Sequence, residues 1–384
     1  MSKSYYSLGL MSGTSGDGID ASIIKSDGDT KYEVILDKYY KYTDEIYEKF
    51  HSLKESINDA GDLFKFKKEL LFLETEITLF HSNLVNEIIK NSKTDIDLIG
   101  FHGQTILHIP EDQLSKQLGI GKLLSFHTKK IVICDFRAND LKNRGQGAPL
   151  APIFHKLLVN QNKLSLPVTI LNIGGIANIT SINSNNIMIS SDVGPGNCLI
   201  DKWIRLNSNK VFDKDGLIAR SGKVNTFILK QALESFYLSY ISRKRSYDIR
   251  NFDLSFARGL SLEDGAATLT EFSAEIITSK MLIDINKNNE PIDVFASTAK
   301  YNIYVCGGGR KNKLLIESIE KKIQAKNIKN KIKLIDDLGA DGNFIESQAF
   351  AYLAIRSYLK LPISFPETTG CIKPSTGGII VKNY

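Results

Sequence analysis

The residues best suited to chemistry lie near the N-terminus, in the stretch LMSGTSGDGID from Leu10 to Asp20. Glycines, hydroxyl side chains and two aspartates alternate here, between two apolar stretches that predict strands. Glycine lets a backbone come close to a ligand, and Ser12, Thr14 and Ser15 add hydroxyl donors beside exposed N–H groups. Such a turn can hold phosphate oxygens, and Asp17 could help to place a metal ion or an attacking group.

Further glycine-rich turns follow other predicted strands: Gly174 and Gly175 in NIGGIAN, Gly194 to Gly196 in DVGPGN, and Gly307 to Gly309 in CGGGRKN. One glycine-rich hairpin alone usually only turns the chain, but several at strand ends favour a nucleotide site. None of them matches G-x-x-x-x-G-K-[ST], so the protein is not a P-loop protein. CGGGRKN fits G-x-G-x-x-G poorly, so a Rossmann dinucleotide site has weak support.

The elements that must position these turns occur in the same order twice. Residues Tyr5 to Leu10, Asp20 to Lys25 and Tyr32 to Lys41 predict a meander of three strands, and helical apolar spacing follows. After Pro167 the order begins again, with strands on both sides of the Gly174 turn and long helices after them. An α/β pattern used twice predicts two related lobes.

We therefore expect a two-lobed α/β protein with a mixed sheet in each lobe. The length of 384 residues suits two domains. The N-terminal lobe is predicted to span residues 1–165 and the C-terminal lobe residues 166–384, with a return of the last residues to the N-terminal lobe left open. Because small ligands usually bind between domains, we expect a cleft lined by residues 13–17 and 174–178.

Composition excludes several classes of protein. Hydrophobic residues make up 42% and charged residues 24%, an ordinary globular balance. The net charge of +6 is scattered without interleaved aromatic residues, which argues against nucleic-acid binding. No signal peptide or membrane-spanning run is evident, so we expect a soluble, cytoplasmic protein without a membrane partner. The four cysteines lack C-x-x-C spacing, which favours free thiols in a reducing compartment.

The motifs taken together resemble the anhydro-N-acetylmuramic acid kinases, within the actin-like and sugar-kinase ATPase superfamily. The similar stretches are GLMSGTSGDGID, FHGQTILHIP, GQGAPLAPIFH, LNIGGIANIT, DVGPGNCLID, ATLTEFSA and VCGGGRKN. Each is weak alone, but the ordered set from about Leu10 to about Ala351 is specific. Two positions depart from the family's pattern: Gly16 stands where a larger residue is usual, and Val193 replaces a threonine.

This resemblance implies a ribonuclease H-like fold in each lobe, with ATP and Mg²⁺ as cofactors. Asp192 matches the family's catalytic aspartate at a predicted strand exit and is expected to be the base that activates water. The alternative is an aspartate that caps the following helix. Asp17 is the candidate ligand for Mg²⁺. The nucleotide is assigned to Gly13, Thr14, Ser15, Gly16, Asp17, Gly18, Ile19, Asp20, Gly174, Gly175, Gly307, Gly308, Gly309 and Asn312.

The sugar is assigned to a separate polar set: His102, Gln104, Arg137, Asn139, Gln146 and Glu346. Arg137 is suited to a carboxylate. The alternatives are a satisfied structural histidine for His102, a cap of the following helix for the turn that contains Gln146, and a solvated acid at a helix start for Glu346. Trp203, at apolar helical spacing, is expected in the core.

The implied reaction adds water at the anomeric carbon of a 1,6-anhydro sugar and passes the γ-phosphoryl group of ATP to the 6-oxygen. The product, N-acetylmuramic acid 6-phosphate, belongs to peptidoglycan recycling. Because the phosphoryl group takes the departing oxygen, one carboxylate suffices. A kinase of another anhydro sugar such as levoglucosan, and an actin-like or chaperone-like ATPase, are the alternatives. A homodimer is expected from the family, although no residue requires it.

Overall fold

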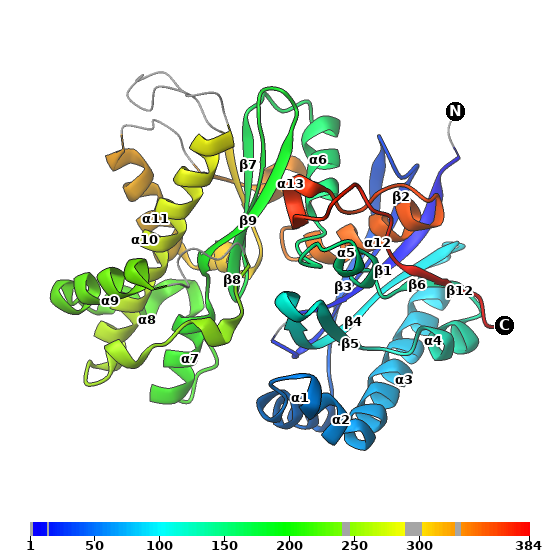
Figure 1. Ribbon diagram of the computed structural model, residues 1–384, viewed down its shortest axis with the longest axis horizontal. Helices are drawn as coiled ribbons and strands as arrows, with labels where there is room; N and C mark the ends of the chain where they lie inside the picture. The colour runs from blue at the N-terminus through cyan, green and yellow to red at the C-terminus, as the bar shows by residue number, and fades with distance from the viewer. Residues whose placement is uncertain (1–2, 14, 240–245, 289–301, 327–331) are drawn as a thin grey trace. The chain divides into compact units, whose positions relative to one another are not determined.

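The computed structural model describes residues 3–13, 15–239, 246–288, 302–326 and 332–384. The chain forms two compact units, shown with their elements labelled in Figure 1. Unit 1 comprises Met1–Lys163 and Phe344–Tyr384, and unit 2 comprises Leu164–Asn343. Unit 2 is therefore one continuous stretch of chain, whereas unit 1 is assembled from two.

Unit 1 is built on a seven-stranded mixed sheet in the order β12-β6-β4-β1-β2-β3, with β5 paired to β4. β1, β2 and β3 form an antiparallel meander, and β1 also pairs in parallel with β4, as β4 does with β6. The strands are β1 (Tyr5–Ser12), β2 (Gly18–Ser26), β3 (Tyr32–Lys41), β4 (Leu98–Ile109), β5 (Leu114–Leu118), β6 (Ile131–Cys134) and β12 (Ile379–Val381).

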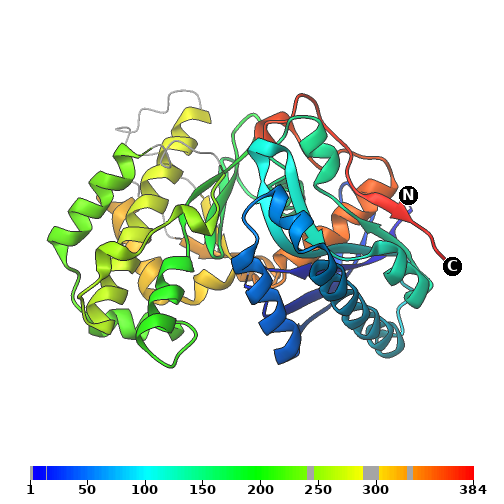
Figure 2. The same cartoon turned by 60° about the horizontal axis from the view of Figure 1, so that its bottom comes forward.

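Helices cover both faces of this sheet (Figure 1, Figure 2). Strand alternation sets the faces: Leu8 and Leu10 enter an apolar core with α1, α3 and α4, while Gly9 between them faces α12. The helices of unit 1 are α1 (Asp44–Ser56), α2 (Ala60–Lys65), α3 (Lys67–Ser92), α4 (Gly121–Thr128), α5 (Ala138–Lys142), α6 (Pro152–Gln161), α12 (Ile345–Tyr358) and α13 (Pro366–Thr369).

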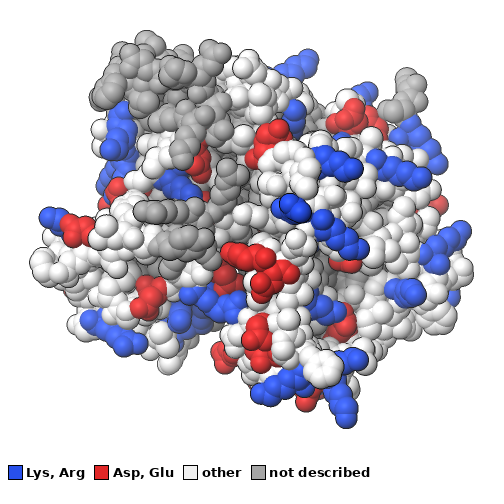
Figure 3. Space-filling model, viewed as in Figure 1, with Lys and Arg blue, Asp and Glu red and all other residues white. Residues whose placement is uncertain are grey.

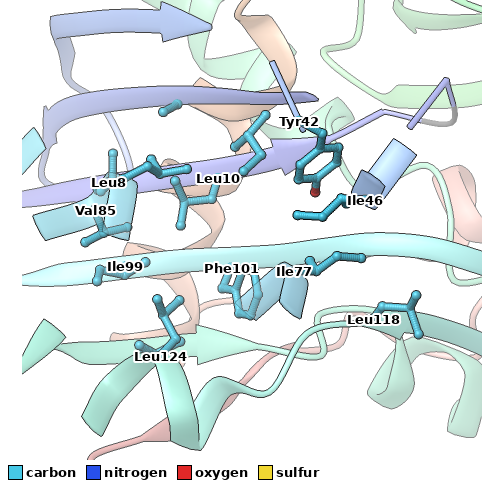
Figure 4. Close-up of a cluster of buried hydrophobic side chains, with 14 of the residues drawn as sticks. Leu8, Leu10, Tyr42, Ile46, Ile77, Val85, Ile99, Phe101, Leu118 and Leu124 are labelled. Carbon is cyan, nitrogen blue, oxygen red and sulfur yellow. The ribbon is translucent and has the colours of Figure 1, made fainter. Parts of the chain in front are cut away.

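The core on the α3 side of the sheet anchors the first glycine-rich turn. Leu10 at the end of β1 and Phe101 of β4 pack with Ile77 of α3 and Ile46 of α1 (Figure 4). All four are at most 7% exposed. Burial of an aliphatic or aromatic side chain contributes about 1.5–3 kcal/mol, so this packing holds β1, which leads into the turn, and its neighbour β4 in place.

Unit 2 repeats the strand order of unit 1. Its five-stranded sheet runs β11-β10-β7-β8-β9; β7 to β9 form an antiparallel meander, and β7 is parallel to β10. The strands are β7 (Val168–Ile173), β8 (Ile176–Ile182), β9 (Met188–Pro195), β10 (Asn302–Cys306) and β11 (Ile332–Leu334). Its helices are α7 (Cys198–Asn207), α8 (Leu217–Ser221), α9 (Thr226–Leu238), α10 (Leu262–Asn288) and α11 (Lys313–Ala325).

The two sheets confirm the predicted α/β fold with a mixed sheet in each lobe, in which the first strand of each meander also pairs in parallel with a later strand. The cleft between the lobes stays a prediction. Two details differ from what the local sequence predicts. KIKLIDD predicts a strand but forms only three residues of strand followed by a 3₁₀ turn. The polar residues of FHGQT, with His102 and Gln104, predict the exit of a strand, whereas β4 continues through them to Ile109. Trp203 is 3% exposed, as predicted for a core residue.

Surface and thiol chemistry are unremarkable in both units. Lys and Arg side chains are interspersed with Asp and Glu on the face shown in Figure 3. All four cysteines are free; Cys134 is half-buried and the others are buried. Among the helices of the described ranges, none is both long enough and apolar enough to cross a bilayer.

The burial of two histidines predicts that the folded protein becomes less stable as the pH falls. Burial lowers the pKa of His81 and of His155 to about 4, from 6.5. Between these values the unfolded chain binds more protons, so the free energy of unfolding falls as the pH drops from 6.5 toward 4. From pH 6.5 to 5.0 each histidine should remove up to about 2 kcal/mol. We expect His81→Phe to lessen this loss in urea titrations, with exposed His127→Phe as control; an unchanged pH dependence would contradict it.

Candidate active site

The first glycine-rich turn joins β1 to β2 in unit 1. The Gly13 carbonyl accepts hydrogen bonds from the Gly16 amide at 3.1 Å and from Gln104 Nε2 at 2.8 Å. The Ser15 hydroxyl donates to Asp17 Oδ1 at 2.5 Å. These bonds hold the Gly13 carbonyl within unit 1 and fix the shape of the turn. Thr14, also assigned to phosphate, lies outside the described residues.

The remaining residues assigned to this turn belong to the sheet. Gly18, Ile19 and Asp20 lie in β2, where they pair with β3. The Ile19 side chain is fully buried in the apolar core. Of these three residues, Asp20 has the only functional side chain.

Unit 2 holds the second turn, between β7 and β8, against the start of α7. The Gly174 carbonyl accepts from the Asn197 amide at 2.9 Å, and the Gly175 carbonyl accepts from the Gly196 amide at 3.0 Å. A Cβ on Gly196 would lie 2.3 Å from the Gly174 oxygen, so glycine is required there for this contact. These hydrogen bonds thus hold the β7–β8 turn against the segment that follows β9.

A third turn follows β10 and is held by a buried arginine. Arg310 donates through two nitrogens to Asp336, at 2.8 and 2.9 Å, and also to the Gly307 carbonyl at 3.0 Å. Such a bidentate pair fixes orientation as well as distance. Asn312 caps α11, since its side chain accepts from the Leu315 amide at 3.1 Å. Its carboxamide oxygen therefore has a structural role.

The glycines of these turns fall into two groups. A Cβ on Gly309 would lie 2.2 Å from Ile173 Cγ2, so the fold itself requires that glycine. At Gly13, Gly174, Gly175 and Gly308, by contrast, an added Cβ would meet nothing within 3.4 Å and φ lies outside the left-handed region. The packing of the described residues does not explain these four. Close approach of a ligand to the backbone would, so they fit a nucleotide.

Asp192 lies within β9, opposite Asn178 of β8, rather than at a strand exit. Its Oδ2 accepts from the Tyr247 amide at 2.7 Å. It does not cap α7, whose N-cap residue is Asn197 and makes no side-chain capping bond. The structural alternative considered for Asp192 is therefore wrong.

The Asp192 carboxyl group has the electrostatics of a base. Burial raises its pKa from 3.8 to about 6. The Tyr247 amide, the charge of Lys280 and the Ser246 hydroxyl lower the pKa, but their effect is smaller than that of burial. A carboxylate with a pKa near 6 is ionised at neutral pH and is a stronger base than an ordinary aspartate. This is what activation of a water molecule requires.

The residues assigned to the sugar all belong to unit 1, and two of them, His102 and Gln104, lie where β4 leaves β6. β4 is parallel to β6 only as far as Phe101, and from Gln104 it pairs with β5. Gly103, at φ 75°, marks the change. His102 and Gln104 thus lie inside a long strand, at the end of its parallel part, rather than at a strand exit.

Arg137 links several of these residues. It donates to His102 Nε2 at 2.9 and 3.3 Å and to the Gly147 carbonyl at 2.7 Å. Since His102 Nδ1 donates to the Gly103 carbonyl at 2.7 Å, His102 is the neutral tautomer that can accept. Burial, with the Arg137 charge, holds the pKa of His102 well below its usual value. His102 is thus a partnered histidine, and Arg137 supplies the positive charge.

The other sugar candidates differ in position. Glu346, in the first turn of α12, is close enough for its charge to act on Arg137, so it is not merely a solvated acid. Asn139 donates to the Thr376 carbonyl and ties α5 to the C-terminal segment. Gln146 does not cap α6, whose N-cap is Ala151. Gln104 is fully buried, and its Oε1 has no partner among the described residues.

Comparison with known proteins identifies the family. A profile of the anhydro-N-acetylmuramic acid kinases matches residues 5–383. The chain belongs to this family. The anhydro-N-acetylmuramic acid kinase of Pelagibacter ubique (strain HTCC1062) is 53% identical to it over 386 residues, covering 100% of both chains. That of Brucella canis is 37% identical over 385 residues, covering 98% of both.

Solved structures of sugar kinases are more distantly similar. A ROK family glucokinase from Streptomyces griseus in complex with glucose and AMPPNP has a TM-score of 0.39 at 12% identity, with 91% of this chain and 99% of that chain covered. Hexokinase from Schistosoma mansoni complexed with glucose has a TM-score of 0.43 at 10% identity, with 91% and 85% covered.

Both departures from the anhydro-N-acetylmuramic acid kinase motifs have a structural reason. Val193 is fully buried in the core of unit 2 with Ile277, an apolar setting that suits a methyl group better than the hydroxyl of a threonine. Gly16 has φ 63°, and a Cβ there would lie 2.3 Å from Phe50 Cε1. A larger side chain could not be accommodated in this conformation.

Several residues next to the candidate site were not found from the sequence. Tyr247 contacts Asp192 from 55 positions away, and Lys280 donates to the Tyr247 hydroxyl at 2.9 Å. Neither lies in a recognisable motif. Arg310 was part of VCGGGRKN, and an arginine directly after three glycines was a signal that could have been used.

The Asp192 assignment can be tested with a matched pair of aspartates. Because its pKa is raised from 3.8 to about 6, the free energy of unfolding falls as the pH rises through this window. Asp192→Asn should therefore raise stability at pH 7.5 by roughly 1–2 kcal/mol, discounted for partial exposure, and lower kcat about 10²-fold or more. Wild-type kcat should fall below about pH 6.

Asp201 in α7 is the control. Burial raises its pKa to about 6 as well, and it is not among the residues assigned to the nucleotide or the sugar. Asp201→Asn should stabilise the protein in the same way but keep wild-type turnover. If Asp192→Asn behaves like Asp201→Asn in turnover assays, Asp192 is not the base.

Two neighbouring glycines test the nucleotide assignment. Gly308→Ala adds a Cβ with nothing within 4 Å, so the melting temperature should not change, while the KM for ATP should rise about tenfold. Gly309→Ala meets Ile173 and should instead lower stability by about 1–3 kcal/mol. Calorimetric melting and initial rates separate the two effects. An unchanged KM in Gly308→Ala would remove this turn from the nucleotide site.

Proposed function

We propose that this protein is an ATP-dependent anhydro-N-acetylmuramic acid kinase. It opens the 1,6-anhydro bridge with water and phosphorylates the 6-oxygen, which gives N-acetylmuramic acid 6-phosphate and ADP for peptidoglycan recycling. Its four free thiols fit the cytoplasm, where this recycling takes place. The homodimer expected from the family stays a prediction.

The observation that carries the proposal is the connection between the candidate base and the second turn. Asp192 in β9 pairs with Asn178 in β8, and Asn178 pairs with Asn172, just before the Gly174 turn. The segment after β9 donates to both carbonyls of that turn. The candidate base and a turn suited to phosphate therefore lie in one three-stranded meander, β7 to β9. Hydrolytic opening coupled to phosphoryl transfer needs both.

In this reaction the Asp192 carboxylate accepts a proton from the water that attacks the anomeric carbon. The bond from that carbon to the 6-oxygen breaks as the new carbon–oxygen bond forms. ATP, when bound, supplies the phosphoryl group that takes the departing oxygen, so no second carboxyl group has to protonate it. The Tyr247 amide, fixed at 2.7 Å, keeps the carboxylate oriented through the step.

The polar cluster of unit 1 would bind the sugar. N-acetylmuramic acid carries a lactyl group that ends in a carboxylate. The described contacts of Arg137 use three of the five N–H groups of a guanidinium, which leaves two N–H groups for this carboxylate. Burial lowers the pKa of Arg137 only to about 10, so it is charged at neutral pH. The unpartnered Oε1 of buried Gln104 would accept from a sugar hydroxyl.

Mg²⁺ would be held mainly through phosphates and water. No group of three or more acidic, histidine or cysteine side chains suited to a metal occurs among the described residues. Mg²⁺ commonly uses one or two carboxylates together with nucleotide phosphates, and Asp17 at the first turn can supply one. The cation would neutralise charge on the transferred group.

The test is ADP production with and without sugar. We expect ADP formation to require anhydro-N-acetylmuramic acid, and levoglucosan, which has no lactyl carboxylate for Arg137, to be a much poorer substrate. In heavy-oxygen water the label should enter the sugar product and not phosphate. ADP formation that is equally fast without sugar would indicate a shape-changing ATPase instead, and equal use of levoglucosan would indicate the other sugar kinase.

A further inference from the structure

Helix α1 contacts the first glycine-rich turn directly. His51, in the last turns of α1, places Nε2 2.9 Å from the Ser15 carbonyl oxygen. A carbonyl can only accept, so Nε2 carries the proton. Just before α1, the Tyr42 amide donates to the Asp17 carbonyl at 3.0 Å. Two carbonyls of the turn are therefore bound by the segment from Tyr42 to His51.

The bond from His51 fixes a peptide group that is also bound on its other side. The amide of the same Ser15–Gly16 peptide donates to the Gly13 carbonyl at 3.1 Å. Since a peptide is planar, its C=O and N–H rotate together. With both ends bound, the group cannot turn unless both hydrogen bonds break.

The neighbouring residue, Phe50, packs against Gly16 of the same turn. Its ring is fully buried and occupies the space where a side chain on Gly16 would stand, with Cε1 2.3 Å from a built Cβ. The His51 ring lies against Tyr47 and Phe50, with centroid distances of 4.2 and 5.3 Å. The donor is thus held by aromatic contacts on its own helix.

We propose that His51 is a positioning residue for nucleotide phosphates: it fixes the Ser15–Gly16 peptide so that the first turn is preorganised before ATP binds. This inference rests on the proposed function in one respect, the assignment of the first turn to phosphates. A preorganised turn loses less conformational freedom on binding, so removal of the His51 donor should weaken the binding of phosphates and leave the sugar unaffected.

The test compares two substitutions at His51. His51→Leu removes the donor, while His51→Gln can place an amide N–H near the position of Nε2. We expect His51→Leu to raise the Kd for ADP and the KM for ATP about tenfold, with kcat at saturating ATP and the KM for sugar within about twofold of wild type. His51→Gln should recover most of the loss. His127→Leu, at an exposed histidine of α4, is the matched control.

Binding of adenosine, which has no phosphates, distinguishes a specific effect of His51 on the phosphate turn from a general loss of structure. Because the turn acts on phosphates, His51→Leu should bind adenosine as well as wild type does while it binds ADP less well, with both measured by calorimetry. Equal affinity of His51→Leu and wild type for ADP would overturn the proposal, as would equal weakening for ADP and adenosine. Wild-type protein that binds ADP but does not phosphorylate the sugar would refute the proposed function, and the ADP comparison would still decide the role of His51.

Discussion

Helix α12 lies so close to strands β1 and β4 that a Cβ on Gly9 would stand 1.9 Å from the Ser347 carbonyl oxygen, and one on Gly100 2.3 Å from that of Phe350. Only glycine at both positions permits this backbone contact. The arrangement of the residues assigned to the sugar depends on this contact, because α12 brings Glu346 close enough for its charge to act on Arg137 and places the Phe350 ring 4.5 Å from the His102 ring. Neither of these glycines belongs to a turn, and each is required by packing alone.

The glycines that the sequence shows in turn motifs are required for different reasons. Gly16 and Gly309 are fixed by neighbours within their own unit, whereas a Cβ on Gly308 would meet nothing within 4 Å and one on Gly175 would make only ordinary van der Waals contacts. A sequence shows both kinds as the same letter. The structure separates them, because the space around a backbone depends on residues far along the chain, such as Phe50 beside Gly16. Only the unexplained glycines are evidence for a ligand.

Strand-forming residue types and the turn residues between them were sufficient to predict the two meanders, because both are local properties of the sequence. The positions of the functional side chains were less accessible. His102 was expected after a strand, but β4 continues by exchanging one partner strand for another at Gly103, which no local pattern indicates. The environment of Asp192 depends on Tyr247 and Lys280, brought together only by tertiary packing. The sequence was enough to single out Asp192, but not to predict its pKa or its hydrogen-bond partners.

The division of unit 1 between the two ends of the chain has a consequence for biosynthesis. Strands β1 to β6 leave the ribosome first, yet the helix that covers the Gly9 and Gly100 side of their sheet is made only after all of unit 2. Unit 2, being continuous, can complete its core while the N-terminal sheet still has one bare face. Exposed sheet surface of this kind is prone to aggregation. The first-made part of this protein is therefore the last to be finished, and its sheet stays incompletely covered until α12 has been made.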